Sequence, residues 1–140
     1  MTINTNEVTK KERDCLLVLS RLQDGEFPAR LSEISRDMGI KAPTALNIIE
    51  RLEEKSMVER KKGMVLLTKE GEATVSSLLF IHRVMETLFV TSGVPTDNAC
   101  EEVEKFDYLI PVSSASKVSK SIGSPKMCPH GEAIELEERQ

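Results

Sequence analysis

Apolar positions in the first half of the chain recur every three or four residues in three segments, and two short β-prone runs follow. A spacing of three to four residues is typical of an amphipathic helix. Thr9 and Glu12 form a capping-box pattern, Gly39 breaks the chain before the third segment, and Pro43 suits a first helical turn. Gly63 can supply the positive φ of a tight hairpin. The pattern predicts helices over residues 9–22, 32–38 and 43–55, and strands over residues 57–60 and 64–68.

The second half of the chain is predicted to be helical throughout. A long segment over residues 68–90 is apolar around much of its circumference, which is typical of a helix that is buried or shared with a second subunit. A break at residues 92–95 precedes shorter helices over residues 97–111 and 112–122. On the helix over residues 97–111, four polar side chains fall within about a quarter-turn of one another: Cys100, Glu104, Asp107 and Tyr108.

The order helix, helix, turn, helix, basic hairpin is that of a winged helix-turn-helix. We therefore predict a mainly α protein, with a winged helix-turn-helix over residues 1–71 and an all-helical domain over residues 72–140. In such folds the first residues of the third helix meet base edges in the major groove, and the hairpin reaches phosphate or a minor groove. The residues expected at these contacts are Pro43, Thr44, Asn47, Arg60, Lys61 and Lys62. An ordinary three-helix bundle, or a winged helix used for protein contacts, is the alternative.

Composition and charge narrow the class of protein. The net charge is −4, but residues 1–70 carry 13 Lys and Arg against 12 Asp and Glu, whereas residues 71–140 carry 6 against 11. The first half therefore suits a polyanion and the second a cation. No apolar run approaches the roughly 20 residues that span a bilayer, and the N-terminus lacks a signal peptide. Three widely separated cysteines fit a reducing compartment, so we expect a cytoplasmic protein without membrane contact.

Candidate metal ligands lie in three places. His82 and Glu86 are four residues apart, so they share a helix face and can share a cation; a simple hydrogen bond between them is the alternative. Cys100, Glu104 and Asp107 add a second donor face. Asp14 either borders the core, where its charge would need a cation, or pairs with a neighbouring Lys10 or Arg13. Mixed nitrogen and oxygen donors with at most one thiolate favour Mn²⁺ or Fe²⁺ over a structural zinc site.

These features together resemble the metal-dependent transcriptional repressors of the diphtheria toxin repressor and manganese transport regulator family. The resemblance covers residues 9–134 and is carried by short motifs: Leu67-Thr68-x-x-Gly71, His82-x-x-x-Glu86, Glu104-x-x-Asp107 and Pro125-x-x-Cys128-Pro129-His130-Gly131. The family's SH3-like domain is absent, so the chain resembles the short form. The second domain is then expected to carry dimerisation and metal binding and to end in a flexible tail.

The resemblance also implies roles for single residues. Asp14, Glu104 and Asp107 match the ligands of one family site, and His82, Glu86 and Cys100 match those of another. Tyr108 stands where the family has a histidine, and Asp107 where it has a longer glutamate, which weakens the first site. We interpret the Cys128–His130 segment as a structural turn with a buried thiol, with metal ligation as the alternative.

The function expected from these observations is metal-responsive repression. A homodimer would bind a double-stranded operator when a divalent cation, Mn²⁺ or Fe²⁺, occupies the acidic cluster and ties the first helix to the later ones. The alternative is a winged-helix regulator that senses redox state through Cys100 without metal. The chain lacks GxSxG, HExxH and phosphate-loop motifs, so an enzyme is not expected.

Overall fold

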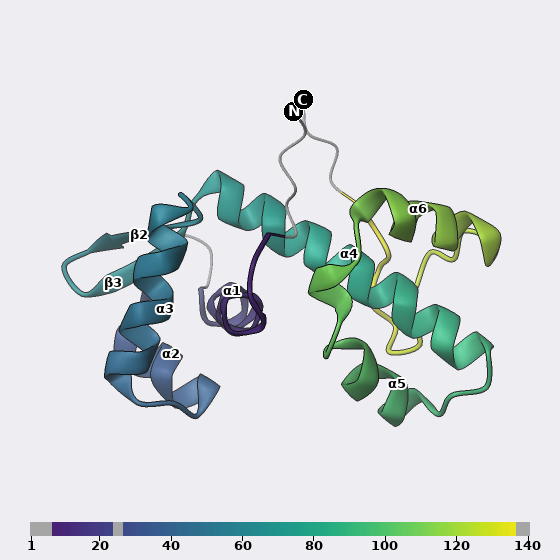
Figure 1. Ribbon diagram of the computed structural model, residues 1–140, viewed down its shortest axis with the longest axis horizontal. Helices are drawn as coiled ribbons and strands as arrows, with labels where there is room; N and C mark the ends of the chain where they lie inside the picture. The colour runs from purple at the N-terminus through teal and green to yellow at the C-terminus, as the bar shows by residue number, and fades with distance from the viewer. Residues whose placement is uncertain (1–6, 24–26, 137–140) are drawn as a thin grey trace. The chain divides into compact units, whose positions relative to one another are not determined.

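A computed structural model describes residues 7–23 and 27–136. The chain divides into two compact units, Val8–Val75 and a second that begins at Ser76. The described residues of the first unit form, before the long helix that follows, α1 Lys10–Leu22, β1 Ala29–Arg30, α2 Leu31–Met38, α3 Ala42–Glu54, β2 Val58–Lys61 and β3 Met64–Leu67. The order confirms the predicted winged helix-turn-helix, and Figure 1 shows the β2–β3 wing beside α3.

Local signals in the sequence explain where these elements begin and end. The Thr9 hydroxyl caps α1 and Glu12 reaches back to the Thr9 backbone, as the capping-box pattern predicts. Gly39 ends α2 in the left-handed conformation, with φ of 68°. Lys62 and Gly63 both have positive φ at the wing tip, which suits a tight hairpin. The strand β1, which pairs with β3 to give the order β1-β3-β2, was not predicted.

The core of the first unit comes from the apolar faces of its helices and the inner face of the wing. Its largest fully buried apolar side chains are Leu16, Leu19, Ile34, Ile48, Ile49, Leu52, Val58 and Val65. One charged group joins them: the Glu12 carboxylate is buried, and Lys55 Nζ lies 2.6 Å from it. Burial alone would raise the pKa of Glu12, but hydrogen bonds from Lys55 and the Thr9 backbone, together with the positive charges of Lys55 and Arg51, lower the pKa.

Thr68 and Gly71 fix the start of the next helix against the wing. The Thr68 hydroxyl donates to the Ser56 carbonyl at 2.6 Å and accepts from the Gly71 amide at 3.1 Å. A Cβ on Gly71 would lie 2.0 Å from the Met57 carbonyl oxygen. Only glycine therefore permits this close approach of backbone to backbone.

The second unit is built on the long helix α4, Lys69–Thr91, which starts within the first unit. It is followed by α5 Thr96–Val103, the 3₁₀ turn η1 Asp107–Leu109 and α6 Val112–Ser121. Figure 1 shows α5 and α6 on either side of the second half of α4. The residues buried between α4 and α6 include Phe80, Ile81, Val84 and Ala115, and Ile134 of the C-terminal segment packs against them.

Two expectations about this unit need correction. The single helix predicted over residues 97–111 is wrong, because α5 ends at Val103 and η1 follows after a turn. The Phe106 ring lies 5.8 Å from that of Phe89 on α4, and the chain turns there. The expectation that no segment is long and apolar enough to cross a membrane also fails, because α4 is so by length and composition alone. Of the most apolar 18 residues of α4, 44% are buried inside the protein. Its buried Glu86 favours a core helix.

Candidate metal centre

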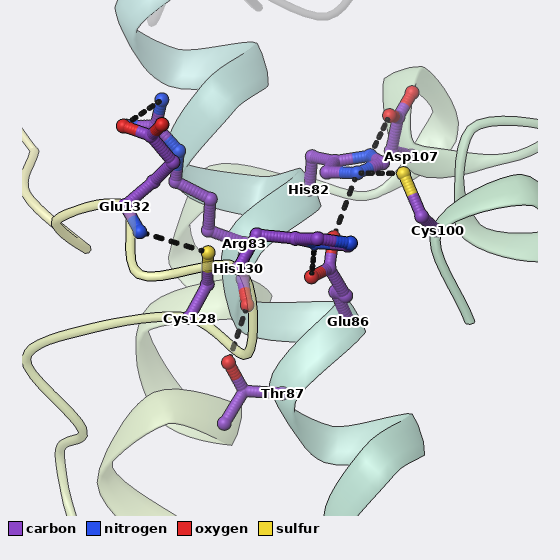
Figure 2. Close-up of polar contacts among 9 residues, drawn as sticks. All are labelled: His82, Arg83, Glu86, Thr87, Cys100, Asp107, Cys128, His130 and Glu132. Atoms are coloured by element: carbon purple, nitrogen blue, oxygen red, sulfur yellow. Dashed lines mark hydrogen bonds and ion pairs between the residues drawn. The ribbon is translucent and has the colours of Figure 1, made fainter. Parts of the chain in front are cut away.

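Three potential ligands from α4 and α5 converge in the second unit. His82 and Glu86 lie one turn apart on α4, with His82 Nε2 3.1 Å from Glu86 Oε2. Cys100 on α5 places its Sγ 3.5 Å from the same ring nitrogen. One nitrogen, one oxygen and one sulfur atom thus lie within 4.8 Å of one another. Figure 2 shows this convergence around His82.

Asp107 approaches the other side of the His82 ring. Its Oδ2 lies 2.9 Å from His82 Nδ1, and the carboxylate is fully buried. The other ring nitrogen, Nε2, faces Glu86 and Cys100, so a proton held at Nδ1 by Asp107 would leave the Nε2 lone pair for a cation. This arrangement is the carboxylate–histidine pairing that orients metal-bound imidazoles in proteins. The structure therefore places Asp107 behind His82 and outside the three-atom cluster.

The Cys128–His130 segment brings a second group of donors to Glu86. His130 Nδ1 lies 2.6 Å from Glu86 Oε1, the carboxylate oxygen that faces away from His82. Cys128 is buried, and its Sγ joins the nitrogen of His130 and an oxygen of Glu86 within 4.8 Å. The segment is a turn closed by a Gly131 to Cys128 backbone hydrogen bond. It is thus both the structural turn expected from the sequence and a candidate donor set.

Arg83 fastens this turn to α4. Its guanidinium donates to the Ala133 carbonyl at 2.9 Å and lies 3.9 Å from the Glu132 carboxylate. A β-bridge between Met127 and Ala133 closes the base of the turn. The turn is therefore held at its base by contacts that do not involve the candidate ligands.

The remaining predicted ligands lie elsewhere. Glu104 follows the end of α5 and is exposed. Asp14 belongs to the first unit, and its Oδ1 lies 2.6 Å from Lys10 Nζ and 3.0 Å from Arg13 Nη1. This pairing is the alternative to cation binding that the sequence left open for Asp14. The two basic side chains already balance its charge. The common helix face predicted for Cys100, Glu104, Asp107 and Tyr108 is lost with the break after Val103.

The donor set fits a divalent transition metal. Glu86 is buried, with 2% of its side chain exposed, and each of its oxygens faces an imidazole nitrogen. A buried carboxylate facing a nitrogen lone pair is unfavourable without a proton or cation between them. A cation held by imidazole, thiolate and carboxylate would supply that charge. His82, Glu86 and Cys100 could therefore hold a metal ion, as could Glu86, Cys128 and His130.

The predicted DNA-contacting residues all lie on the surface of the first unit. Pro43, Thr44 and Asn47 are exposed at the start of α3, and Lys61 and Lys62 are exposed at the wing. Arg60 is also exposed, but its guanidinium donates twice to the Glu53 carboxylate, at 2.8 and 3.1 Å. Arg60 is thus held toward α3, whereas the two lysines extend the positive charge to the tip.

A groove beside the wing was not foreseen from the sequence. It has a volume of about 520 Å³ and is lined by Arg30, Leu31, Ser32, Lys62, Gly63 and Met64. Arg30 belongs to β1, the strand that the sequence pattern did not reveal.

Comparison with known proteins shows what the chain is similar to. Residues 68–136 match the family model described as "Iron dependent repressor, metal binding and dimerisation domain". An uncharacterised HTH-type transcriptional regulator from Aeropyrum pernix is 30% identical over 120 residues, which are 85% of this chain and 66% of that protein. The chain thus spans just under two thirds of the length of that relative.

Solved structures share the fold. A hypothetical protein from Sulfolobus solfataricus is 34% identical with a TM-score of 0.82, covering 92% of this chain and all of that one. The manganese regulator SloR is 25% identical with a TM-score of 0.71, covering 99% of this chain and 62% of that one. The family model and these likenesses meet on the helices that carry His82, Glu86 and Cys100. The chain belongs to the metal-dependent repressor family of the diphtheria toxin repressor and the manganese transport regulator.

Proposed function

We propose that this protein is a transcriptional repressor that binds a double-stranded operator as a homodimer when a divalent cation is bound. The observation that carries the proposal is the orientation of His82. Its Nδ1 is held by the buried Asp107, and its Nε2 faces the buried Glu86 and the Cys100 thiol. An imidazole fixed in this way, with a carboxylate and a thiol at its free nitrogen, is organised to accept a cation.

We assign His82, Glu86 and Cys100 as ligands and Asp107 as the residue that positions His82. The bound cation would neutralise Glu86 and the Cys100 thiolate and so hold α5 against α4. Asp14 and Glu104, the other predicted ligands, are not required by this assignment, because one is paired with Lys10 and Arg13 and the other is exposed. Among Mn²⁺ and Fe²⁺, the thiol favours Fe²⁺, since sulfur ligands prefer softer cations than Mn²⁺.

DNA binding would use the surface of the first unit. Thr44 and Asn47 can read base edges from the start of α3, and Pro43 sets the first turn. Lys61 and Lys62, with Arg60 behind them, would contact phosphates. The homodimer follows from the family's dimerisation domain, and two such heads read half-sites about one helical turn apart.

The test is anaerobic DNA binding with and without metal. Duplexes selected from a random pool would be titrated with protein in Fe²⁺, Mn²⁺, Zn²⁺ or chelator, and affinity measured by fluorescence anisotropy. We expect affinity to rise by 5- to 150-fold with the effective cation, the usual range of allosteric coupling. His82→Gln should abolish the metal response, while Glu104→Gln should keep it.

Three results would count against the proposal. Equal affinity in every metal and in chelator would refute the metal response, and loss of binding on oxidation in chelator would favour redox sensing through Cys100. A response abolished by Glu104→Gln but retained by His82→Gln would move the site to the other predicted ligands.

A further inference from the structure

Glu86 is shared by two donor sets of the same composition. On one side Oε2 faces His82 Nε2 with Cys100 Sγ beside it, and on the other Oε1 faces His130 Nδ1 with Cys128 Sγ beside it. Each set therefore offers one imidazole nitrogen, one thiol sulfur and one carboxylate oxygen. Figure 2 shows the two thiols on either side of Glu86 in this view.

We propose that the Glu86 carboxylate bridges two divalent cations, one bound by His82 and Cys100 and the other by His130 and Cys128. The proposal rests on the proposed metal-dependent function and adds the second cation and the bridge. Within each set the donor atoms lie within 4.8 Å of one another. Ligands of a four-coordinate cation with bonds of about 2.0–2.3 Å lie roughly 3.3–3.8 Å apart, so small side-chain adjustments close either set.

The charge of the buried groups supports two cations over one. Glu86 and Asp107 are buried carboxylates, and Cys100 and Cys128 become thiolates when they bind a metal, releasing their protons. The four groups then carry about four negative charges, which two divalent cations balance. With a single cation the other thiol keeps its proton, so three negative charges face two positive ones, and buried charge without a partner is costly.

Backbone groups of Glu132 contact Cys128 as well. The Glu132 backbone N–H lies 3.4 Å from Cys128 Sγ, and the Cys128 amide donates to the Glu132 carbonyl at 2.8 Å. A backbone N–H at the sulfur stabilises a metal-bound thiolate. The second cation would thus hold the C-terminal turn to α4, as the first holds α5.

Sharing one carboxylate makes the two sites dependent on each other. A cation on either side fixes the Glu86 rotamer and removes its freedom to swing away from the other side. Occupancy of one site should therefore raise the affinity of the other, within the 5- to 150-fold range of coupled binding.

The experiment measures stoichiometry and coupling on the full chain under anaerobic conditions. Apoprotein would be titrated with Co²⁺ and followed by native mass spectrometry, by thiolate-to-cobalt absorption and by electron paramagnetic resonance. We expect two Co²⁺ per chain, thiolate absorption that grows across both equivalents, and magnetic coupling between the ions when both sites are filled. Cys100→Ser and Cys128→Ser should each bind one Co²⁺ ion tightly, whereas the control Cys15→Ser should bind two Co²⁺ ions.

Three outcomes would overturn the bridge. They are one cation per wild-type chain, two cations without magnetic coupling, or two tightly bound cations in both Cys100→Ser and Cys128→Ser. Any of these with metal-dependent DNA binding intact leaves the proposed function standing, whereas no cation and metal-independent DNA binding overturns both. Because Glu86→Gln can disturb folding, the coupling measured in the wild-type chain is the decisive readout for the bridge.

Discussion

Replacing Asp107 by Asn tests whether this residue orients His82 or binds the cation itself. The change keeps the size of a fully buried side chain and removes the charge that faces His82 Nδ1 at 2.9 Å. Loss of a carboxylate behind a metal-bound imidazole typically reduces metal affinity 10- to 100-fold. That corresponds to about 1.4–2.7 kcal/mol. Loss of a direct ligand would also change the number of atoms bound to the cation.

The assay is competition for Fe²⁺ or Co²⁺ against a chromophoric chelator, together with X-ray absorption of the loaded protein. For Asp107→Asn we expect weaker binding by 10- to 100-fold with an unchanged coordination number. The matched control is Glu104→Gln, which removes the same charge from an exposed position three residues earlier and should shift affinity less than twofold. Unchanged affinity in Asp107→Asn, or a lost oxygen ligand, would refute the orienting role.

Three further changes test the first unit. Gly71→Ala should lower the free energy of unfolding in urea by about 1–3 kcal/mol, because its Cβ would meet the Met57 carbonyl; the exposed neighbour Glu72→Ala should not. Burial first, and then neighbouring carboxylates, raise the pKa of Cys15 from 9.0 to about 12. As the pH rises, the thiol ionises in the unfolded chain before it does in the folded one. The free energy of unfolding, constant below pH 9, should therefore fall by about 2 kcal/mol by pH 10.5 in the wild type relative to Cys15→Ala. Equal pH profiles of the two proteins would contradict this. Lys62→Ala should weaken DNA binding equally for all sequences and reduce the salt slope by about 1; a sequence-dependent loss would instead indicate base contact.

The first unit was predictable from sequence because its signals are local. The capping box at Thr9, the left-handed Gly39 and the positive φ of Gly63 each act within a few residues. Apolar periodicity then predicted the three helices. The strand β1 was not predicted because two residues are too few to show an alternation of apolar and polar positions.

The second unit was harder because its decisive contacts join distant residues. His130 and Glu86 are 44 residues apart, and Asp107 and His82 are 25 apart, so no spacing rule could pair them. Helical periodicity also failed after Val103. The chain turns where the Phe106 ring meets that of Phe89 on α4, and this contact joins residues too distant for a local pattern to show. The pattern showed which residue types carry the chemistry but could not show which of them meet.

These pairings bear on which cation the protein would sense. At the positions that resemble one family site, Asp14 is paired with Lys10 and Arg13, and Asp107 contacts His82. The family's histidine is replaced by Tyr108, a poor ligand when neutral. The chain instead gathers a thiol in each donor set around Glu86. Because thiolates discriminate against hard cations, the sulfur atoms should make the protein prefer Fe²⁺ to Mn²⁺. A Cys100→Asp substitution should shift this preference toward Mn²⁺.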